Sequence, residues 1–296
     1  MTRLSVLVPN RNSPYTTATI NDILAKAAGD VEVICHVDEK FPEPRVTDRR
    51  VTYLTHDGEP RGMRAGINAA AAVATGEYLL KCDDHVLWAP GYDVELIKAH
   101  QEDNWVQIPR RYSLNVERWD INRDRPHRDY HYLCYPAKGK THDDGMHGVE
   151  WWERQRERAI GYDVDDTPSM QGSCWFCTRH HFTDTLGYMS EVGYGKFAQE
   201  AQEIGMKTWL GGGALKVNKL TWYAHWHKGK AGRGFRFDHS ENVRGINWSA
   251  WYWMTNQWEG RVHDFAWFIE EQFPGMPTWP TDWRRWYADS AMPVSA

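Results

Sequence analysis

Short apolar stretches alternate with helical stretches in the first third of this chain, and this alternation limits the fold more than any other feature. The expected strands are 4–8, 31–37, 51–54 and 78–82, and the expected helices are 16–28 and 62–75. Strands that alternate with helices indicate an α/β fold with a mostly parallel sheet flanked by helices. In such open sheets, ligands bind beyond the carboxyl ends of the strands.

The later part of the chain is less regular. A strand is expected at 170–177, a helix at 199–210, and one or two strands at 215–226. Residues 110–165 lack a clear period, so we expect a loop-rich insertion at the mouth of a site, with the acidic run at 163–166 as loop. Of the 17 tryptophans, ten lie between Trp222 and Trp286. We expect one domain over 1–236 and a Trp-rich extension over 237–296 that packs back on it.

Composition excludes several classes of protein. The net charge of -5 argues against a general polyanion binder, so nucleic-acid contact would need a local basic face. The five cysteines have no disulfide-framework spacing, and the lone Cys174–Cys177 pair lies in an apolar strand, so free thiols are expected. There is no signal peptide and no apolar run long enough to cross a bilayer, so we expect a cytoplasmic protein with no membrane partner.

One strand end carries chemistry that can hold a metal ion. The strand at 78–82 leads directly into Asp83, Asp84 and His85. Positions two apart on an extended strand share a face, so a carboxylate and an imidazole would lie side by side. A divalent ion held there can grip a diphosphate, although acidic clusters at strand ends are also common turn chemistry. Asn10 and Asp38 stand at two other strand ends of the expected sheet.

These motifs together resemble the family 2 glycosyltransferases, which are nucleotide-sugar enzymes of the GT-A fold. The opening strand and its loop, with Pro9, Asn10 and Arg11, are similar to the start of that family, and Gly62 to Tyr78 aligns without a gap on its helix-plus-strand segment. Asp83-x-His85 then falls on the family's metal motif. That motif usually ends in Asp; the His is similar to the D-x-H of polypeptide N-acetylgalactosaminyltransferases.

Two later segments extend the resemblance, which covers about 4–230 with 90–170 unmatched. Gln199-Glu200 is similar to the family's acidic pair, with Glu200 at the place of the catalytic carboxylate, although Glu203 is an alternative acid and Gln199 replaces an acid. The strand 221–227 resembles the one whose terminal His completes the metal site. His225 and His227 share a face of that strand, and the sequence does not choose between them.

The resemblance implies a metal-dependent hexosyl- or pentosyltransferase that moves a sugar from a nucleotide-diphosphate donor to an acceptor hydroxyl. Glu200 would act as the base and the reaction would invert the anomeric carbon. His85 in place of Asp favours Mn²⁺ over Mg²⁺. Arg61 and Arg64 would replace an arginine that the family has at the position of Ile67, and Asp84 would contact the donor ribose or orient the turn. The expected donor-binding residues are Pro9, Asn10, Arg11, Asp38, Arg61, Arg64, Asn68, Asp84 and Lys228.

The acceptor is the most open part of the hypothesis. The basic run 227–236 is expected to close over the diphosphate or to line a path for a polyanion. The segment 218–228 also resembles glycosyltransferase-like proteins of bacterial viruses. That alternative makes hydroxymethylated pyrimidines in DNA the acceptor, with C-terminal tryptophans stacked on bases and the host cytoplasm as the location. A third hypothesis is a non-catalytic module that binds a sugar nucleotide or a glycan. It stays open because Gln199 replaces an acid of the family.

Overall fold

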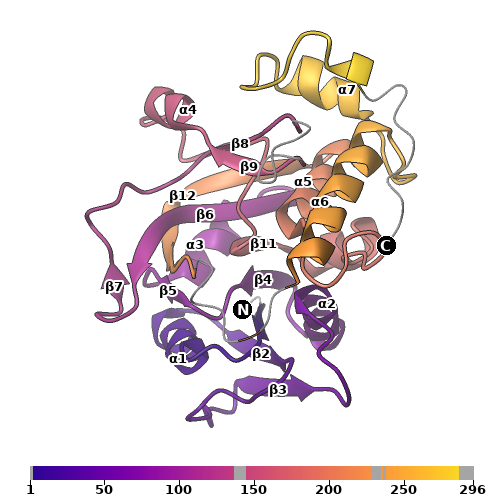
Figure 1. The fold of residues 1–296 in the computed structure, drawn as a ribbon. Helices are drawn as coiled ribbons and strands as arrows, with labels where there is room; N and C mark the ends of the chain where they lie inside the picture. Colours follow the sequence, from indigo (N-terminus) through magenta and orange to yellow (C-terminus); the bar gives the residue numbers. More distant parts are fainter. Residues whose placement is uncertain (1–2, 137–144, 229–234, 236–237, 287–296) are drawn as a thin grey trace.

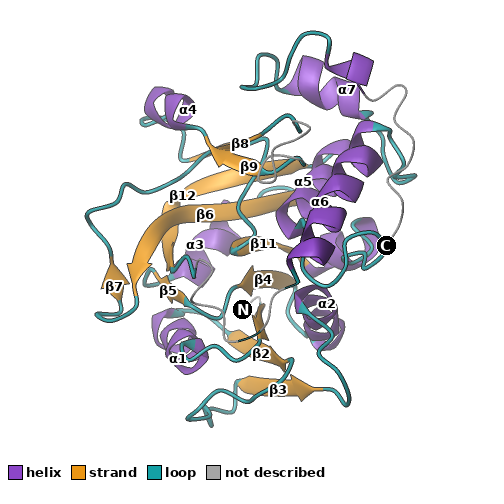
Figure 2. Ribbon diagram, in the orientation of Figure 1, coloured by secondary structure: helices purple, strands orange, loops and turns teal. Residues whose placement is uncertain are grey.

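A ten-stranded sheet with helices on both faces organises the chain (Figure 1, Figure 2). The computed structural model describes residues 3–136, 145–228, 235 and 238–286. The strands are β1 Leu4–Asn10, β2 Val31–Val37, β3 Val51–Thr55, β4 Tyr78–Cys82, β5 Val86–Trp88, β6 Trp105–Asn115, β7 Asp120–Ile121, β8 His131–Leu133, β9 Gly148–Glu150, β10 Val164–Asp166, β11 Cys174–Thr178 and β12 Ala214–His225. The α-helices are α1 Thr16–Lys26, α2 Met63–Val73, α3 Tyr92–Ala99, α4 Trp152–Glu157, α5 Glu200–Leu210, α6 His239–Met254 and α7 Phe265–Trp267. Shorter helical turns lie at His181–Thr185, Phe268–Gln272 and Trp283–Trp286.

The strand order is β10-β12-β6-β11-β4-β1-β2-β3, which confirms the predicted α/β class. The pairs β1–β2, β1–β4, β2–β3 and β6–β12 are parallel. β11 is antiparallel to both of its neighbours and joins the two parallel groups. Parallel neighbours bring the carboxyl ends of β1, β2 and β4 to one edge of the sheet, where the predicted site lies.

The core lies on both faces of the sheet because helices cover both. Leu7 of β1 packs in a cluster with α2 and α5, while Val6 and Val8 pack on the opposite face with α1 and α3. A strand buried on both faces forms a nearly continuous apolar run, and residues 4–8 have this pattern. β5 and α3 had no predicted counterpart.

The interpretation of residues 110–165 as loop-rich was wrong in part. β6 continues to Asn115 and pairs in parallel with β12, so its last six residues belong to the main sheet. Polar residues on that half of β6 obscured the apolar pattern. The acidic run predicted as loop is the edge strand β10, which pairs antiparallel with β12. The short strands β8 and β9 and helix α4 complete the region, and residues 137–144 lie outside the described part of the chain.

The C-terminal segment packs on the same core as α5. Asp238 caps α6 by accepting hydrogen bonds from the backbone N–H groups of Ser240 and Glu241. Trp253 and Trp283 are buried in the cluster that contains α5. The described tryptophans from 248 to 283 are buried or partly buried, and several contact each other with ring centroids 5.6–6.4 Å apart.

Two smaller expectations have clear outcomes. All five cysteines are buried, and the Cys174–Cys177 pair forms no disulfide. Among the described helices, none has both the length and the apolar character that crossing a bilayer requires.

Candidate active site

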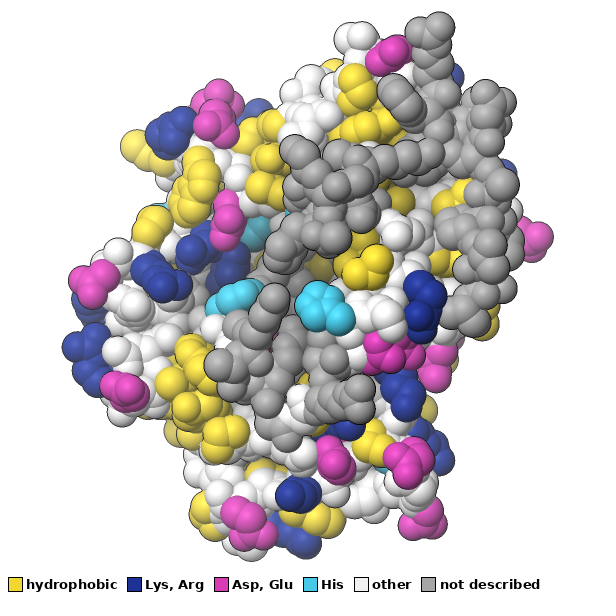
Figure 3. Space-filling view, in the orientation of Figure 1, with side chains coloured by type: hydrophobic (Ala, Val, Ile, Leu, Met, Phe, Trp, Pro, Cys, Tyr) yellow, Lys and Arg dark blue, Asp and Glu magenta, His cyan; other side chains and the backbone are white. Residues whose placement is uncertain are grey.

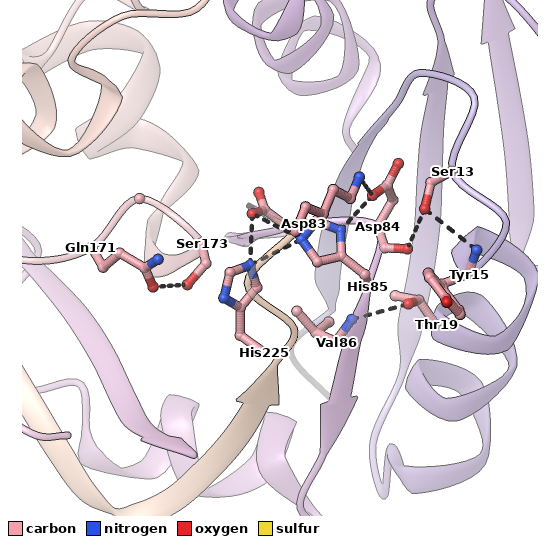
Figure 4. A network of polar contacts seen from close by, with 12 residues as sticks. Ser13, Tyr15, Thr19, Asp83, Asp84, His85, Val86, Gln171, Ser173 and His225 are labelled. Carbon is pink, nitrogen blue, oxygen red and sulfur yellow. Dashed lines mark hydrogen bonds and ion pairs between the residues drawn. The ribbon is translucent and has the colours of Figure 1, made fainter. Parts of the chain in front are cut away.

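Three metal-competent side chains meet at the carboxyl edge of the sheet. Asp83 and His85 follow β4, and His225 ends β12 (Figure 4). The His225 Nε2 atom lies 3.2 Å from Asp83 Oδ2 and 3.0 Å from His85 Nε2, and the latter two atoms are 3.7 Å apart. Neighbouring ligands of a six-coordinate ion with bonds of 2.0–2.2 Å lie about 3 Å apart. The three atoms therefore have the spacing of one face of such a coordination shell.

Asp84 holds His85 in the orientation that this cluster needs. Its Oδ1 atom lies 2.6 Å from His85 Nδ1 and accepts a hydrogen bond of 3.0 Å from Lys228 Nζ. Its Oδ2 atom accepts from Asn10 Nδ2 at 3.2 Å. A carboxylate on one ring nitrogen directs the other nitrogen toward a metal, as in many metal sites. This contact with His85 differs from both expected roles of Asp84, which were contact with the donor ribose and orientation of the turn.

The protonation states of the cluster suit a cation. Burial lowers the pKa of His225 to about 3, so its imidazole is neutral at pH 7. Burial opposes ionisation of Asp83, but Lys81 and His225 outweigh it and hold the pKa of that carboxyl well below its usual range. Neutral imidazole and ionised carboxylate are the forms that ligate metals. Two imidazole nitrogens 3.0 Å apart also need a proton or a cation between them.

A first cavity of about 440 Å³ opens over this cluster. Six of the predicted donor-binding residues line it, namely Pro9, Asn10, Arg11, Asp38, Asp84 and Lys228. Phe235 of the predicted basic run also lines it. Lining residues that the sequence did not suggest are His36, Gly62, Met63, Gln171, Lys196, Phe197, Asp238 and Glu241. These residues come from segments far apart in the chain, which no local pattern connects.

Asp38 lines the first cavity, but its carboxylate is already used within the protein. It accepts hydrogen bonds from the backbone N–H groups of Arg61, at 2.7 Å, and of Gly62. His56 Nε2 lies 3.1 Å from the same carboxylate. The side chain of Arg61 is exposed and does not line the cavity, so Arg61 acts here through its backbone.

Arg64 and Asn68 do not reach the first cavity, in contrast to the prediction. Arg64 is fully buried, pairs with Glu203, and donates to the carbonyl oxygens of Ser190 and Ala198. Asn68 exchanges two hydrogen bonds with the backbone of Met189. Both side chains come from α2 and fasten the segment that precedes α5. This is a structural role, because every one of these contacts is inside the protein.

Glu200 lies one layer behind the cavity wall. Both of its oxygens are within 3.0 Å of Lys81 Nζ, and Trp175 Nε1 donates to Oε1 at 2.8 Å. Lys81 is fully buried and also donates to Asp83 Oδ1 at 2.8 Å. A Cβ atom placed on Gly172 would lie 3.1 Å from Glu200 Oε2, so the carboxylate sits directly behind a residue without a side chain. Burial raises the pKa of Glu200, although Lys81 opposes this effect.

A second cavity of about 640 Å³ adjoins the first. Gln171, His225 and His227 line both cavities. His227 is therefore at the site, but among the described residues the three-membered metal-competent cluster contains His225 and not His227. The remaining lining of the second cavity comes from β6 and from the region 116–150, with Trp226 beside His225. Of the predicted basic run, residues 229–234 and 236 lie outside the described part of the chain.

Lys81 is the main site residue that sequence reasoning missed. A lysine in an otherwise apolar strand, two residues before a metal-competent Asp, was a signal that something acidic must face it, because a buried ammonium requires a partner. This signal does not name the partner of Lys81, which is Glu200 of α5.

The mostly parallel sheet flanked by helices is that of a GT-A glycosyltransferase fold. Residues 5–184, more than half of the chain, match the family described as glycosyl transferase family 2. The chain belongs to this family. No curated protein matches the sequence.

Solved structures resemble the chain at low sequence identity. A crystal structure of GalNAc-T7 with UDP, GalNAc and Mn²⁺ has a TM-score of 0.70 and 16% identity; the match covers 92% of this chain and 57% of that one. Two structures of TarS residues 1–349 from S. aureus, one of them with UDP-GlcNAc, have TM-scores of 0.49 and 0.48 and identities of 18% and 17%. They cover 76% and 79% of this chain and 60% and 62% of their own. The chain thus spans just over half the length of GalNAc-T7 in that structure, and the likeness at this identity concerns the fold.

Proposed function

We propose that this chain is a metal-dependent glycosyltransferase that takes a sugar from a nucleoside-diphosphate donor and passes it to a hydroxyl group. The observation that carries the proposal is that two cavities meet at the cluster of Asp83, His85 and His225. A transfer reaction needs two substrates that approach one point from different sides. The first cavity, at the carboxyl ends of β1, β2 and β4, is where a nucleotide binds in folds of this kind.

The charge of the first cavity supports a requirement for a divalent ion. Its lining has three side-chain cations, Arg11, Lys196 and Lys228, against five carboxylates, Asp38, Asp83, Asp84, Asp238 and Glu241. Such a lining repels a diphosphate unless a cation is added. A bound divalent ion would neutralise the charge that develops on the leaving diphosphate. Two imidazoles and one carboxylate favour Mn²⁺ over Mg²⁺, and the GalNAc-T7 structure contains Mn²⁺ together with UDP.

For the acceptor, we propose Glu200 as the base, reached past Gly172. Its raised pKa from burial suits proton uptake, and Trp175 and Lys81 hold it rigidly. A base on the acceptor side implies inversion at the anomeric carbon, which proton NMR of the product measures. The rival role is positioning, in which Glu200 acts through Lys81 on Asp83.

Modified DNA is the acceptor hypothesis that this structure supports least. That hypothesis came from the resemblance of 218–228 to glycosyltransferase-like proteins of bacterial viruses, and it gave the C-terminal tryptophans the role of stacking on bases. The described tryptophans from 248 to 283 instead pack on the core and on each other. A mass shift on DNA that contains 5-hydroxymethylpyrimidines, after incubation with a panel of donors, is the direct assay for it.

Donor hydrolysis tests the proposal without knowledge of the acceptor. Incubation with a panel of nucleoside-diphosphate sugars should release the nucleoside diphosphate in the presence of Mn²⁺, and EDTA and Asp83→Ala should each abolish the release. Hydrolysis that is indifferent to EDTA would contradict metal dependence. Tight donor binding with no turnover of any sugar would instead favour the non-catalytic binding module.

A further inference from the structure

The second cavity has an excess of positive charge in a protein whose net charge is -5. Its charged lining residues, apart from histidines, are Arg111, Arg125, Arg128, Glu117 and Glu150. Lys and Arg side chains gather next to histidine side chains on the face of the molecule that Figure 3 shows. The two cavities therefore differ in the sign of the charge on their linings. The second has more cations than carboxylates, and the first has more carboxylates than cations.

Two of these arginines are largely removed from water and share one carboxylate. The side chains of Arg111 and Arg128 are 11% and 16% exposed. Glu150 Oε1 accepts a hydrogen bond of 2.7 Å from Arg128 Nε and a weak one of 3.5 Å from Arg111. The buried Nε atom of Arg111 has no hydrogen-bond partner among the described residues. One carboxylate cannot neutralise two guanidinium groups, so an N–H group and a positive charge remain to be satisfied.

Nearby side chains do not supply the missing negative charge. His131 Nε2 lies 3.3 Å from Arg111, and burial, with the charges of Arg111 and Arg128, lowers the pKa of His131 to about 3. The ring is thus neutral at pH 7. Arg125 adds a third cation at the exposed rim, and Glu117 is the only further described carboxylate that lines the cavity.

Another part of the lining is aromatic and belongs to the segment that carries the metal-competent His225. Trp226 follows His225 directly, and its ring makes edge contacts with Tyr15 and His85 at centroid distances of 5.0 and 6.1 Å. Sugar and base rings stack on such faces. A volume of about 640 Å³ is in the range of small-molecule sites, large enough for a ring and one attached group.

We propose that the second cavity binds an acceptor that has an oxyanion, a phosphate or a carboxylate, next to the ring that accepts the sugar. The guanidinium groups of Arg111, Arg125 and Arg128 bind the oxyanion, and the ring lies toward Trp226 and His225. That the bound molecule is an acceptor rests on the proposed glycosyl transfer. That the cavity binds an oxyanion does not, and it is measurable without any donor.

Calorimetric titration of the full chain with single small molecules tests the oxyanion site. The probes are inorganic phosphate, acetate, glucose 6-phosphate, glucuronate and uncharged glucose, each without metal or nucleotide. We expect the anions to bind more tightly than glucose. Arg128→Gln should weaken their binding about tenfold, and Arg125→Gln about threefold, because a buried charged hydrogen bond contributes more than an exposed one.

Matched variants on the same loop make the test specific. Arg123→Gln removes an equally exposed arginine that does not line the cavity, and should leave anion affinity unchanged. Glu117→Gln should raise anion affinity about threefold, because it removes a negative charge that repels the bound anion. A stronger effect on phosphate ligands identifies a phosphorylated acceptor, and a stronger effect on carboxylates identifies an acidic sugar.

Three results would overturn the inference: anions that bind no better than glucose, equal losses in Arg123→Gln and Arg125→Gln, or no binding by any anion. The first would mean that Arg111, Arg128 and Glu150 only fasten β6 to β9. Failure of the proposed glycosyl transfer has a different result. Mn²⁺-dependent donor hydrolysis would be absent, while Arg125→Gln would still weaken the binding of anions.

Discussion

The first and second cavities share His225 but are built in different ways. The first lies on the ends of parallel strands, where consecutive residues such as Asp83, Asp84 and His85 supply the chemistry. The second is enclosed by the long β6 strand, β9 and the loops between them. Its charged residues are spread along the chain from Arg111 to Glu150. Under the proposed function, the first cavity holds the reaction centre and the second selects the acceptor.

The largest expected effect separates the two histidines that end the first cavity. His225→Gln should weaken Mn²⁺ binding about 1,000-fold, because a lost ligand removes several kcal/mol of metal interaction. His227→Gln should change it less than about tenfold, which is the scale of groups outside the ligand set. Calorimetric Mn²⁺ titration of both variants measures the difference. Equal losses would show that the metal cluster is not the one formed by Asp83, His85 and His225.

Variants of Glu200 and Gly172 test whether Glu200 is the base for an acceptor bound in the second cavity. Glu200→Gln should lower the rate of transfer about 10²- to 10⁴-fold, the usual contribution of a general base, with donor affinity retained. Gly172→Ala should also slow transfer, because the new methyl group would lie 3.1 Å from Glu200 Oε2. Steady-state kinetics with a competent acceptor gives both values.

A positioning role for Glu200 has a different signature. In that case Glu200→Gln would weaken Mn²⁺ and donor binding through Lys81 and Asp83, and Gly172→Ala would have almost no effect. Lys81→Met serves as the reference for that outcome, since it removes the ammonium that joins the two carboxylates.

Variants of Arg64 distinguish a structural role beside the first cavity from a role in donor binding. Arg64→Met should lower the free energy of unfolding by about 3 kcal/mol, because it removes one member of a buried ion pair. Arg61→Ala, three positions earlier and exposed, is the matched control and should change stability by less than about 0.5 kcal/mol. Urea unfolding measures both. A change in donor affinity in Arg64→Met, measured where the variant is folded, would return this residue to the binding site.

The smallest expected effect concerns acid sensitivity of the second cavity. Burial and two arginines lower the pKa of His131 to about 3 when folded, against about 6.5 when unfolded. The unfolded chain therefore takes up this proton first, so the contribution of neutral His131 is complete above pH 6.5 and is lost as pH falls toward 3. Between pH 7 and pH 5 the loss is about 2 kcal/mol.

Urea unfolding of wild type and His131→Gln at both pH values isolates this contribution from other titrating groups. The variant should lose about 2 kcal/mol less stability than wild type on going to pH 5. Parallel losses in the two proteins would show that His131 can be protonated in the folded state, and that Arg111 and Arg128 create little positive potential there.

Much of the first cavity was predictable because its signals are local. The strand that ends at Cys82 and the metal-competent Asp83 and His85 that follow it lie within ten positions of one another. The limits of β2 matched the prediction, and α5 begins one residue after its predicted start at Gln199. Short-range periodicity was sufficient here, because a strand buried on both faces and a glycine-terminated helix leave clear marks in sequence.

The choice between His225 and His227 needed the tertiary structure. The same-face argument holds only inside a strand, and β12 ends at His225, which pairs with Val86 of β5 and Ser113 of β6. A bulge between Asn218 and Trp222 also shifts the pairing within β12. Strand ends and bulges depend on the partner strands, so the residues of β12 alone do not reveal them.

The sequence by itself determined the family, the α/β class and two of the three members of the metal-competent cluster, because each of these depends on residues close together in the chain. Only the tertiary structure decided that Arg64 and Asn68 are structural, that Lys81 joins Asp83 to Glu200, and that Arg111, Arg128 and Glu150 surround a second cavity. These contacts join residues 22 to 139 positions apart. The physical reason is that burial of a charge is set by whichever distant segment packs against it.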